Sequence, residues 1–236
     1  MSFNELAITR AMRLIARAMA AGRLEIEACG LDNVPRQGPL ILVARHYHHL
    51  FDGIALFLTV PRRTHLIVTL DWAPNRFTRA VMEALTRLAR WPVVSRPPAL
   101  VNNPDRARRQ AISTQGGVHR HQRRALRAAV RLLIERRALV IFPEGYPNID
   151  PHYTPKTDRE ELLPFKRGFA ALAAAAERRS KAEILIVPVG LHYSGGDRWK
   201  VRLAFGAPVS LKNFSSRQCL MEHVETQVRL LSKIED

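Results

Sequence analysis

Cysteine is scarce in this sequence of 236 residues, which contains only Cys29 and Cys219. Two cysteines cannot form a disulfide framework, and neither has a partner at the spacing of metal ligands. The scarcity excludes a small secreted domain held together by disulfides, and it favours a reducing compartment.

Long apolar runs are also missing. No stretch approaches the roughly 18 apolar residues that a membrane-spanning helix requires. Arginines interrupt the N-terminal segment, so it lacks the continuous apolar stretch of a signal peptide. We therefore expect a cytoplasmic protein, either soluble or bound peripherally to the inner face of the cell membrane.

Acidic residues are few relative to basic ones. The chain has 21 Asp and Glu against 37 Lys and Arg, for a formal net charge of +16. Such an excess predicts an anionic partner: nucleic acid, an anionic membrane or phosphorylated substrates. Charge alone does not choose among these three.

The hydrophobic content of the chain is that of a folded protein. Hydrophobic residues make up 47% of the chain, enough for one sizeable core. We expect one domain over residues 24–236, preceded by an amphipathic helix within residues 1–23. That helix has Arg10, Arg13 and Arg17 opposite its apolar side, and it either packs on the domain or lies on anionic lipid.

Predicted strands and helices alternate along the chain. The predicted strands cover residues 24–27, 39–44, 64–70, 91–94, 138–142, 184–189 and 201–205. The predicted helices cover residues 53–60, 75–89, 119–137, 165–177 and 215–234, and residues 97–117 are predicted to form a long loop. This alternation predicts an α/β fold with a mainly parallel sheet and helices on both faces.

Two of these helices have marked side-chain patterns. In helix 75–89, apolar residues recur at helical spacing, at Phe77, Val81, Leu85 and Leu88. Helix 119–137 is the most basic element, with arginines on one face and apolar residues on the other. Its basic face is either an ordinary solvated surface or a surface for lipid head groups or a polyphosphate.

Titratable side chains follow the strand at residues 39–44. His46, His48, His49 and Asp52 come directly after it, where a helix is about to begin. The junction of a strand end and a helix start is where α/β proteins commonly place their chemistry. A histidine beside a carboxylate suits proton transfer near neutral pH.

Two further strand ends carry polar groups. Arg96 follows the strand at residues 91–94, and Glu144 and Gly145 follow the strand at residues 138–142. Equivalent ends of parallel strands meet at one edge of a sheet, so these segments are expected to form one site. There a base would deprotonate a hydroxyl, an arginine would bind a phosphate, and a glutamate would accept hydrogen bonds from a polyol.

In this order, the motifs resemble those of the glycerolipid acyltransferase family, which contains the lysophosphatidic-acid acyltransferases. That family has a histidine and an aspartate with four residues between them, a strand-end arginine, Phe-Pro-Glu-Gly, and an apolar strand that contains proline. The corresponding blocks here are His46 to Asp52, Arg96, Phe142 to Gly145, and Ile186 to Val189. The resemblance extends over roughly residues 24 to 212.

One departure from the family pattern concerns the base. Five residues, not four, separate His46 from Asp52, and the position with the family spacing is Tyr47. Tyrosine has a pKa of about 10 and is a poor base near neutral pH. We predict His46 as the base, with a one-residue bulge before Asp52, and His48 as the alternative. The altered spacing also leaves open an inactive member that only binds lipid.

The resemblance implies acyl transfer from acyl-CoA or an acyl carrier protein to the hydroxyl of a lysophospholipid, by default 1-acylglycerol-3-phosphate, in phospholipid biosynthesis. Backbone amides at the start of helix 53–60 are the predicted donors to the oxyanion. An anionic membrane surface is the expected partner, and no metal, other cofactor or covalent acyl-enzyme is required.

The resemblance also implies roles for individual residues. His46 would remove the hydroxyl proton and Asp52 would orient its ring. Arg96 would bind the acceptor phosphate, and Glu144 and Gly145 would bind the glycerol part. Lys166 and Arg167 are additional candidates for the phosphate.

Two other function classes are compatible with parts of the sequence. His46, His48 and Asp52 could ligate zinc in a metal-dependent hydrolase, but the remaining histidines are isolated and further ligands are hard to find. The arginine-rich helix and the net charge suit a nucleic-acid-binding protein, but the sequence has no recognised binding motif, and we predict no specific nucleic-acid partner.

Overall fold

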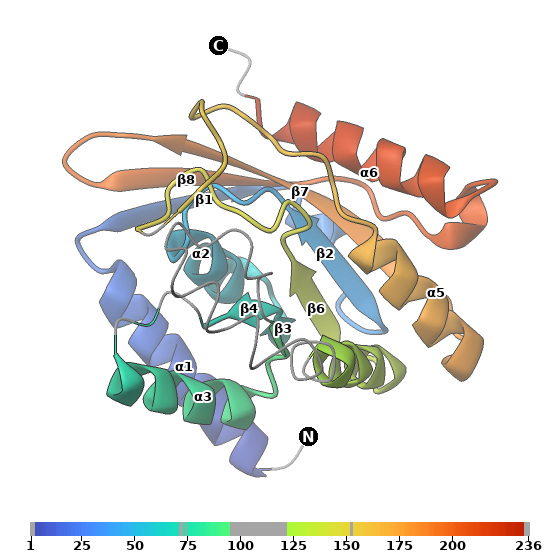
Figure 1. The fold of residues 1–236 in the computed structure, drawn as a ribbon, viewed down its shortest axis with the longest axis horizontal. Coiled ribbons are helices and arrows are strands. Elements are labelled where there is room, and N and C mark those ends of the chain that lie inside the picture. Colours follow the sequence, from blue (N-terminus) through green and yellow to red (C-terminus); the bar gives the residue numbers. More distant parts are fainter. Residues whose placement is uncertain (1–2, 71–72, 74, 95–121, 152, 234–236) are drawn as a thin grey trace, which may run out of the picture.

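A six-stranded sheet forms the centre of the molecule (Figure 1). The computed structural model describes residues 3–70, 73, 75–94, 122–151 and 153–233, which form a single α/β domain. The strands of the sheet, in spatial order, are β1 (Leu24–Cys29), β8 (Trp199–Phe205), β7 (Leu185–Ser194), β2 (Leu40–Ala44), β6 (Ala138–Ile141) and β3 (Thr64–Leu66). Neighbouring strands are parallel except for the antiparallel pair β7 and β8, so the predicted mainly parallel sheet is confirmed.

Helices cover both faces of this sheet, as predicted. On one face lie α1 (Phe3–Ala20) and α2 (Phe51–Thr59); on the other lie the helix at residues 122–134, α5 (Gly168–Ser180) and α6 (Arg217–Leu231). Side chains alternate along β2, so Leu42 belongs to the first core and Val43 to the second, and both are fully buried. This two-sided burial explains why the central strands have continuous apolar sequences.

The predicted strand at residues 64–70 is wrong in one respect, because the structure divides it in two. The Ile67 amide donates to the Val140 carbonyl at 3.1 Å, whereas the next amide, of Val68, donates to Pro92 at 3.1 Å. The chain therefore leaves the main sheet after β3. It continues as β4 (Val68–Thr69), which pairs with β5 (Val93–Val94) in a separate two-stranded sheet.

Strand β7 is longer than predicted, because it extends beyond residue 189 in an antiparallel pairing with β8. Short 3-10 turns, η1 (Leu31–Asn33) and η3 (Leu211–Asn213), follow β1 and β8. The predicted loop at residues 97–117 and the start of the predicted helix at residue 119 lie outside the described residues.

The N-terminal helix has two different sides. Ala16 and Ala20 of α1 are buried in the core beside α2, whereas Leu14 is 65% exposed. One side of α1 therefore packs on the domain while its other side faces outward. The predicted boundary between an N-terminal helix (residues 1–23) and the domain (residues 24–236) stays a prediction. Among the described residues, none of the helices is both long and apolar enough to cross a bilayer.

Helix α3 (Arg76–Ala89) covers little of the core. It begins at Asn75, whose side chain accepts a hydrogen bond from the Thr78 amide at 2.8 Å. Its buried residues are Thr86 and Ala89, whereas Phe77, the largest apolar side chain of the helix, is 79% exposed. An apolar stripe at helical spacing normally packs on a core, so this outward exposure is unusual.

Candidate active site

The candidate site lies where β2 and β6 end. These strands are parallel neighbours, with Val43 opposite Ile141, so the segments that follow them emerge side by side. His46 follows β2 by two residues, and Glu144 follows β6 by three. The fold thus brings together groups that are far apart in the sequence, as expected for the carboxyl edge of a parallel sheet.

His46 and Asp52 are in direct contact. Nδ1 of His46 lies 2.8 Å from Oδ2 of Asp52, whose side chain is completely buried. The five intervening residues wrap around the carboxylate, so that the amides of Tyr47 and His48 also donate to it, at 2.6 and 3.0 Å. The extra residue relative to the family spacing therefore does not separate the pair.

A distant tyrosine completes the surroundings of Asp52. The hydroxyl of Tyr193, on β7, donates to Oδ1 at 2.7 Å. Burial, together with the charge of Asp52, raises the pKa of Tyr193 well above its usual range, so the hydroxyl keeps its proton. With Asp52 accepting hydrogen bonds from the two amides and from Tyr193, the matching tautomer of His46 has its proton on Nδ1 and its lone pair on Nε2.

The imidazole of His46 is the accessible member of this pair. Its side chain is 13% exposed, against 0% for Asp52. The ring stacks on Phe142 with 4.4 Å between the ring centres. His46 is thus oriented on one side by a carboxylate and supported on another by an aromatic ring, with part of its surface open to a reactant.

His48, the alternative base, has a different environment. Its Nδ1 accepts hydrogen bonds from the amides of Leu50 and Phe51, at 3.2 and 3.3 Å, and so caps the start of α2. Burial lowers the pKa of His48 to about 4. In the neutral ring the proton is then on Nε2, so no lone pair is left to accept a substrate proton.

The same contacts show which amides at the start of α2 already have acceptors. The amides of Leu50 and Phe51 are bound by His48, and the amide of Asp52 donates to the His48 carbonyl at 3.4 Å. Helix α2 begins two residues before the predicted start, at Phe51, and these three amides already have acceptors within the protein. These three amides precede the predicted helix 53–60, so the prediction that amides at the start of that helix bind the oxyanion stays a prediction.

Glu144 is buried instead of open to a ligand. Oε1 accepts from the His46 amide at 2.6 Å, and Oε2 accepts from the Leu163 amide at 3.0 Å. Oε2 also pairs with Nζ of Lys156 at 2.5 Å, and both side chains are 0% exposed. These contacts place the Glu144 carboxylate behind the backbone of His46. Its predicted role as a ligand of the acceptor's glycerol part stays a prediction, and such a bond would have to displace a protein donor.

Lys156 was not found from the sequence. Besides Glu144, its ammonium donates to the His46 carbonyl at 2.8 Å and to Oδ1 of Asn148 at 2.9 Å. Burial lowers the pKa of Lys156, although the charge of Glu144 acts in the opposite direction. A loop lysine is usually solvated, so no local pattern marks this one, whose partners all lie elsewhere in the fold.

Arg45 was also missed, although the sequence shows a charged residue directly after an apolar strand. It is only 2% exposed. Its guanidinium contacts the Glu160 carboxylate at 3.3 Å and donates to the carbonyls of Arg159 and Leu191, at 3.1 and 3.4 Å. Arg45 and Lys156 thus fix the loop after β6 onto the edge of the sheet from two sides.

The remaining predicted ligands differ in their placement. Gly145 has a left-handed φ of 79°, which would strain a larger residue, and a Cβ there would lie 2.6 Å from Nζ of Lys166 and would have to displace the end of that side chain. The Lys166 ammonium also lies 5.1 Å from the centre of the Tyr146 ring. Arg167 is exposed at the start of α5. Arg96 lies outside the described residues, so its predicted place in the site stays a prediction.

The arrangement does not support a metal centre built from His46, His48 and Asp52. The two histidines direct their Nδ1 atoms to different partners, a carboxylate and backbone amides. Within the part of the chain that the structure describes, no group of three or more His, Cys, Asp or Glu side chains is placed to hold a metal ion.

Comparisons with known proteins agree with this geometry. Residues 25–192 match the family model described as Acyltransferase. Among solved structures, the fold is similar to the crystal structure of the 1-acyl-sn-glycerophosphate (LPA) acyltransferase PlsC from Thermotoga maritima, with a TM-score of 0.60 and 20% sequence identity over 96% of this chain and 79% of that chain. No curated protein sequence is significantly similar to this chain.

Proposed function

This chain belongs to the acyltransferase family, and on that premise we propose that it moves a fatty acyl group from a thioester to the hydroxyl of a lysophospholipid. The proposed donor is acyl-CoA or an acyl carrier protein, and the proposed acceptor is 1-acylglycerol-3-phosphate. The observation that carries the proposal is the contact of 2.8 Å between Nδ1 of His46 and the buried Asp52. It leaves the lone pair of Nε2 on His46, whose side chain is the more exposed of the pair.

The reaction follows from that protonation pattern. Nε2 of His46 takes the proton of the acceptor hydroxyl while its oxygen attacks the thioester carbonyl carbon. The imidazolium that forms is stabilised by the negative charge of Asp52. As the tetrahedral intermediate collapses, the carbon–sulfur bond breaks and the leaving thiolate takes the proton from His46. The products are an ester and a thiol, with no covalent acyl-enzyme and no cofactor apart from the acyl donor.

Glu144 and Lys156 act on the base through the backbone in this proposal. Glu144 accepts the amide hydrogen of His46, and Lys156 donates to its carbonyl. Both polar groups of the His46 main chain are therefore held by one buried ion pair. Fixing the backbone limits where Nε2 can point, which is the kind of support a base needs to act at a defined distance.

The phosphate of the acceptor needs cationic partners. Arg96, Lys166 and Arg167 are the proposed ligands, and the placement of Lys166 against Gly145 supports its part. A bidentate arginine and an ammonium are suited to phosphate oxygens. The acceptor carries its own acyl chain and resides in a membrane, so we also propose peripheral binding to the anionic inner face of the cell membrane.

The alternative of an inactive lipid-binding member rested on the extra residue between His46 and Asp52. The 2.8 Å contact supports an active member instead, because the intervening chain bulges without separating the pair. A nucleic-acid-binding function has no comparable support, since the buried cluster around Asp52 has no role in binding a phosphate backbone.

The test is thioester turnover by the purified protein, followed as thiol release. Acyl-CoA and acyl carrier protein are each supplied with a panel of lysophospholipids, and the acylated product is identified by mass. Release that depends on the acceptor, and that is lost in His46→Ala, supports the proposal. Release without acceptor, or equal release by His46→Ala, would contradict it.

A further inference from the structure

An exposed apolar stripe runs along α3. Phe77, Val81 and Leu88 lie on one face of this helix and are 79%, 41% and 55% exposed. The helix rests on the protein through a different face, which contains Thr86 and Ala89. An apolar face at helical spacing ordinarily covers a core. The apolar stripe of α3 does not, because the helix packs on the described chain through its other face.

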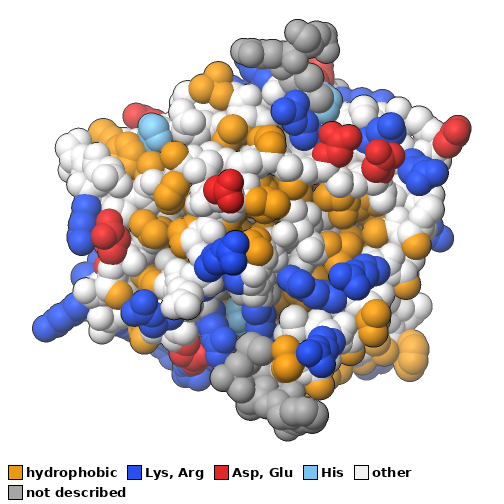
Figure 2. All heavy atoms as spheres, turned by 180° about the vertical axis from the view of Figure 1, so that it is seen from behind, with side chains coloured by type: hydrophobic (Ala, Val, Ile, Leu, Met, Phe, Trp, Pro, Cys, Tyr) orange, Lys and Arg blue, Asp and Glu red, His pale blue; other side chains and the backbone are white. Residues whose placement is uncertain are grey.

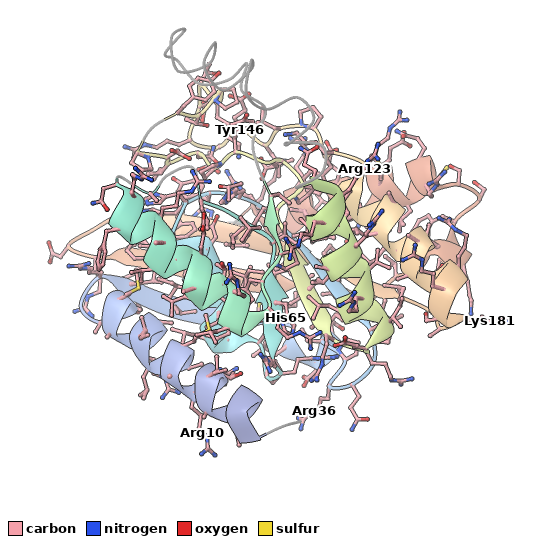
Figure 3. The ribbon with its side chains drawn as sticks, turned by 60° about the horizontal axis from the view of Figure 1, so that its bottom comes forward. Arg10, Arg36, His65, Arg123, Tyr146 and Lys181 are labelled. Atoms are coloured by element: carbon pink, nitrogen blue, oxygen red, sulfur yellow. The ribbon has the colours of Figure 1, made fainter. Side chains whose placement is uncertain are left out.

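The neighbouring helix α1 has a similar surface. Leu14, Ile15 and Met19 are 65%, 50% and 38% exposed, and α1 contacts α3. The two helices lie side by side in Figures 1 and 3, at the edge of the molecule. Figure 2, seen from behind, shows hydrophobic side chains mixed with Lys and Arg on the side where α1 lies. Exposed apolar residues on two helices in contact mark a candidate interaction site.

Charge indicates which partner this surface fits. Arg76 and Arg87 are exposed on α3, and Arg10 and Arg17 are exposed on α1. Figure 3 shows the labelled Arg10 projecting outward from α1. Glu83 is the only acidic residue within the bounds of α3, and it pairs with Arg79 on the same helix at 3.0 Å. The surface is therefore apolar and positively charged.

A second copy of this chain is a poor match for such a surface. A symmetric dimer through α1 and α3 would place arginines of one protomer against arginines of the other, and like charges in an interface are unfavourable. Nucleic acid would match the charge but would leave Phe77 and Leu88 in water. An anionic bilayer matches both features, since apolar side chains enter the acyl boundary and arginines contact the head groups.

We propose that the exposed face of α3, together with the adjoining face of α1, docks this protein on anionic lipid, with Phe77 and Leu88 as the inserted side chains. The inference deepens the proposed function, because it names the surface by which the enzyme reaches an acceptor held in a membrane. In this proposal the apolar stripe of α3 contacts lipid instead of packing on the protein core.

The test is co-sedimentation with vesicles of phosphatidylcholine mixed with phosphatidylglycerol, and with vesicles of phosphatidylcholine alone. Phe77→Ser combined with Leu88→Ser is expected to weaken binding to the mixed vesicles by roughly tenfold or more, because two side chains lose their apolar burial. Arg76→Gln combined with Arg87→Gln is expected to weaken the same binding by roughly fivefold per charge removed, with little change on the uncharged vesicles.

The matched control is Leu230→Ser on α6. Leu230 is 56% exposed, and α6 covers the opposite face of the sheet from α1. Vesicle binding by this control should equal that of the wild type. Unchanged binding by the α3 double variant would overturn the proposal, as would a wild-type dimer in light scattering that the same variant converts to monomer.

Turnover of a short-chain acceptor dissolved below its micelle concentration separates this inference from the proposed function. The α3 double variant should turn over that soluble acceptor at the wild-type rate while losing activity on vesicle-bound acceptor. Wild-type protein that binds vesicles through α3 but releases no thiol would contradict the proposed activity and leave the docking surface supported.

Discussion

The edge of the sheet around Asp52 and the outer face of α3 depart in opposite ways from the usual distribution of charged and apolar side chains. At the first, charged groups are buried: Asp52, Glu144 and Lys156 have no exposed side-chain surface, and each has several polar partners. At the second, apolar groups are exposed, and Phe77 has 79% of its surface in water. Most of the remaining described chain obeys the usual arrangement of apolar residues inside and charges outside.

Both the buried charges and the exposed apolar stripe are unfavourable unless they have partners. A buried charge is tolerated only with partners, so the site edge is a dense network that fixes the backbone of His46. An exposed apolar stripe has no partner within the described chain, so it is expected to find one outside. The first region is therefore predicted to be sensitive to single substitutions, and the second to be tolerant of them in solution.

The largest effect is expected at the imidazole itself. Removal of the base by His46→Ala should lower the rate of acyl transfer by about two to four powers of ten, while the protein stays folded because the amides of Tyr47 and His48 and the Tyr193 hydroxyl still donate to Asp52. Steady-state thiol release and a thermal melt measure the two quantities. A variant with near-normal turnover would mean that the network around Asp52 orients a group that is not the base.

The next effect concerns the buried ion pair. Lys156→Met leaves Glu144 buried without its cationic partner, which should cost about 3–5 kcal/mol of stability and reduce kcat more than it raises KM. Adding Glu144→Gln to Lys156→Met should recover much of the stability, because no uncompensated charge is left. Urea unfolding gives the free energies, and kinetics gives the split between kcat and KM. Equal stability of the single and double variants would contradict the pairing.

A third prediction concerns pH. Burial lowers the pKa of both His48 and His65 from 6.5 to about 4 in the folded protein. The unfolded chain therefore binds more protons between those values, and stability must fall as the pH falls from about 6.5 to about 4. Figure 3 shows His65 well away from Tyr146, which follows β6 at the site edge. Melting curves should show His65→Gln reducing this pH dependence without affecting turnover; an unchanged dependence would refute the contribution of His65.

The smallest effect is expected on α3. Phe77→Ser should change the free energy of unfolding by no more than about 0.5 kcal/mol, because the ring is already exposed. The matched control is Phe169→Ala on α5, a fully buried phenylalanine, which should cost about 3–5 kcal/mol. Denaturant titration of the two variants compares them directly. A large loss in Phe77→Ser would show that the side chain packs within the protein and would remove the contrast between the two regions.

The sequence was sufficient for the architecture, because continuous apolar strands alternating with amphipathic helices leave few arrangements other than a covered, mainly parallel sheet. It also paired His46 with Asp52, because both follow a strand end, and the structure places the two side chains in contact. The break between β3 and β4 could not be predicted. It arises because two consecutive amides, of Ile67 and Val68, donate to the distant carbonyls of Val140 and Pro92.

The orientation of charged side chains was the harder part of the site. Tyr193 is 141 residues from Asp52 and Lys156 is 110 residues from His46, and nothing in their local sequences marks them as partners. The same limitation affects Glu144, whose motif indicates a functional position but not that the carboxylate points inward. For α3, helical spacing identifies the apolar stripe correctly but does not say whether protein or lipid covers it.

The most direct test of the central claim compares thiol release by His46→Ala with release by His48→Asn under identical conditions. Asparagine keeps an acceptor near the start of α2, so the second variant should fold and retain turnover within a few-fold of the wild type, while His46→Ala falls to the background rate. If His48→Asn is inactive yet folded, and His46→Ala still releases thiol in the presence of acceptor, the assignment of His46 as the base is wrong.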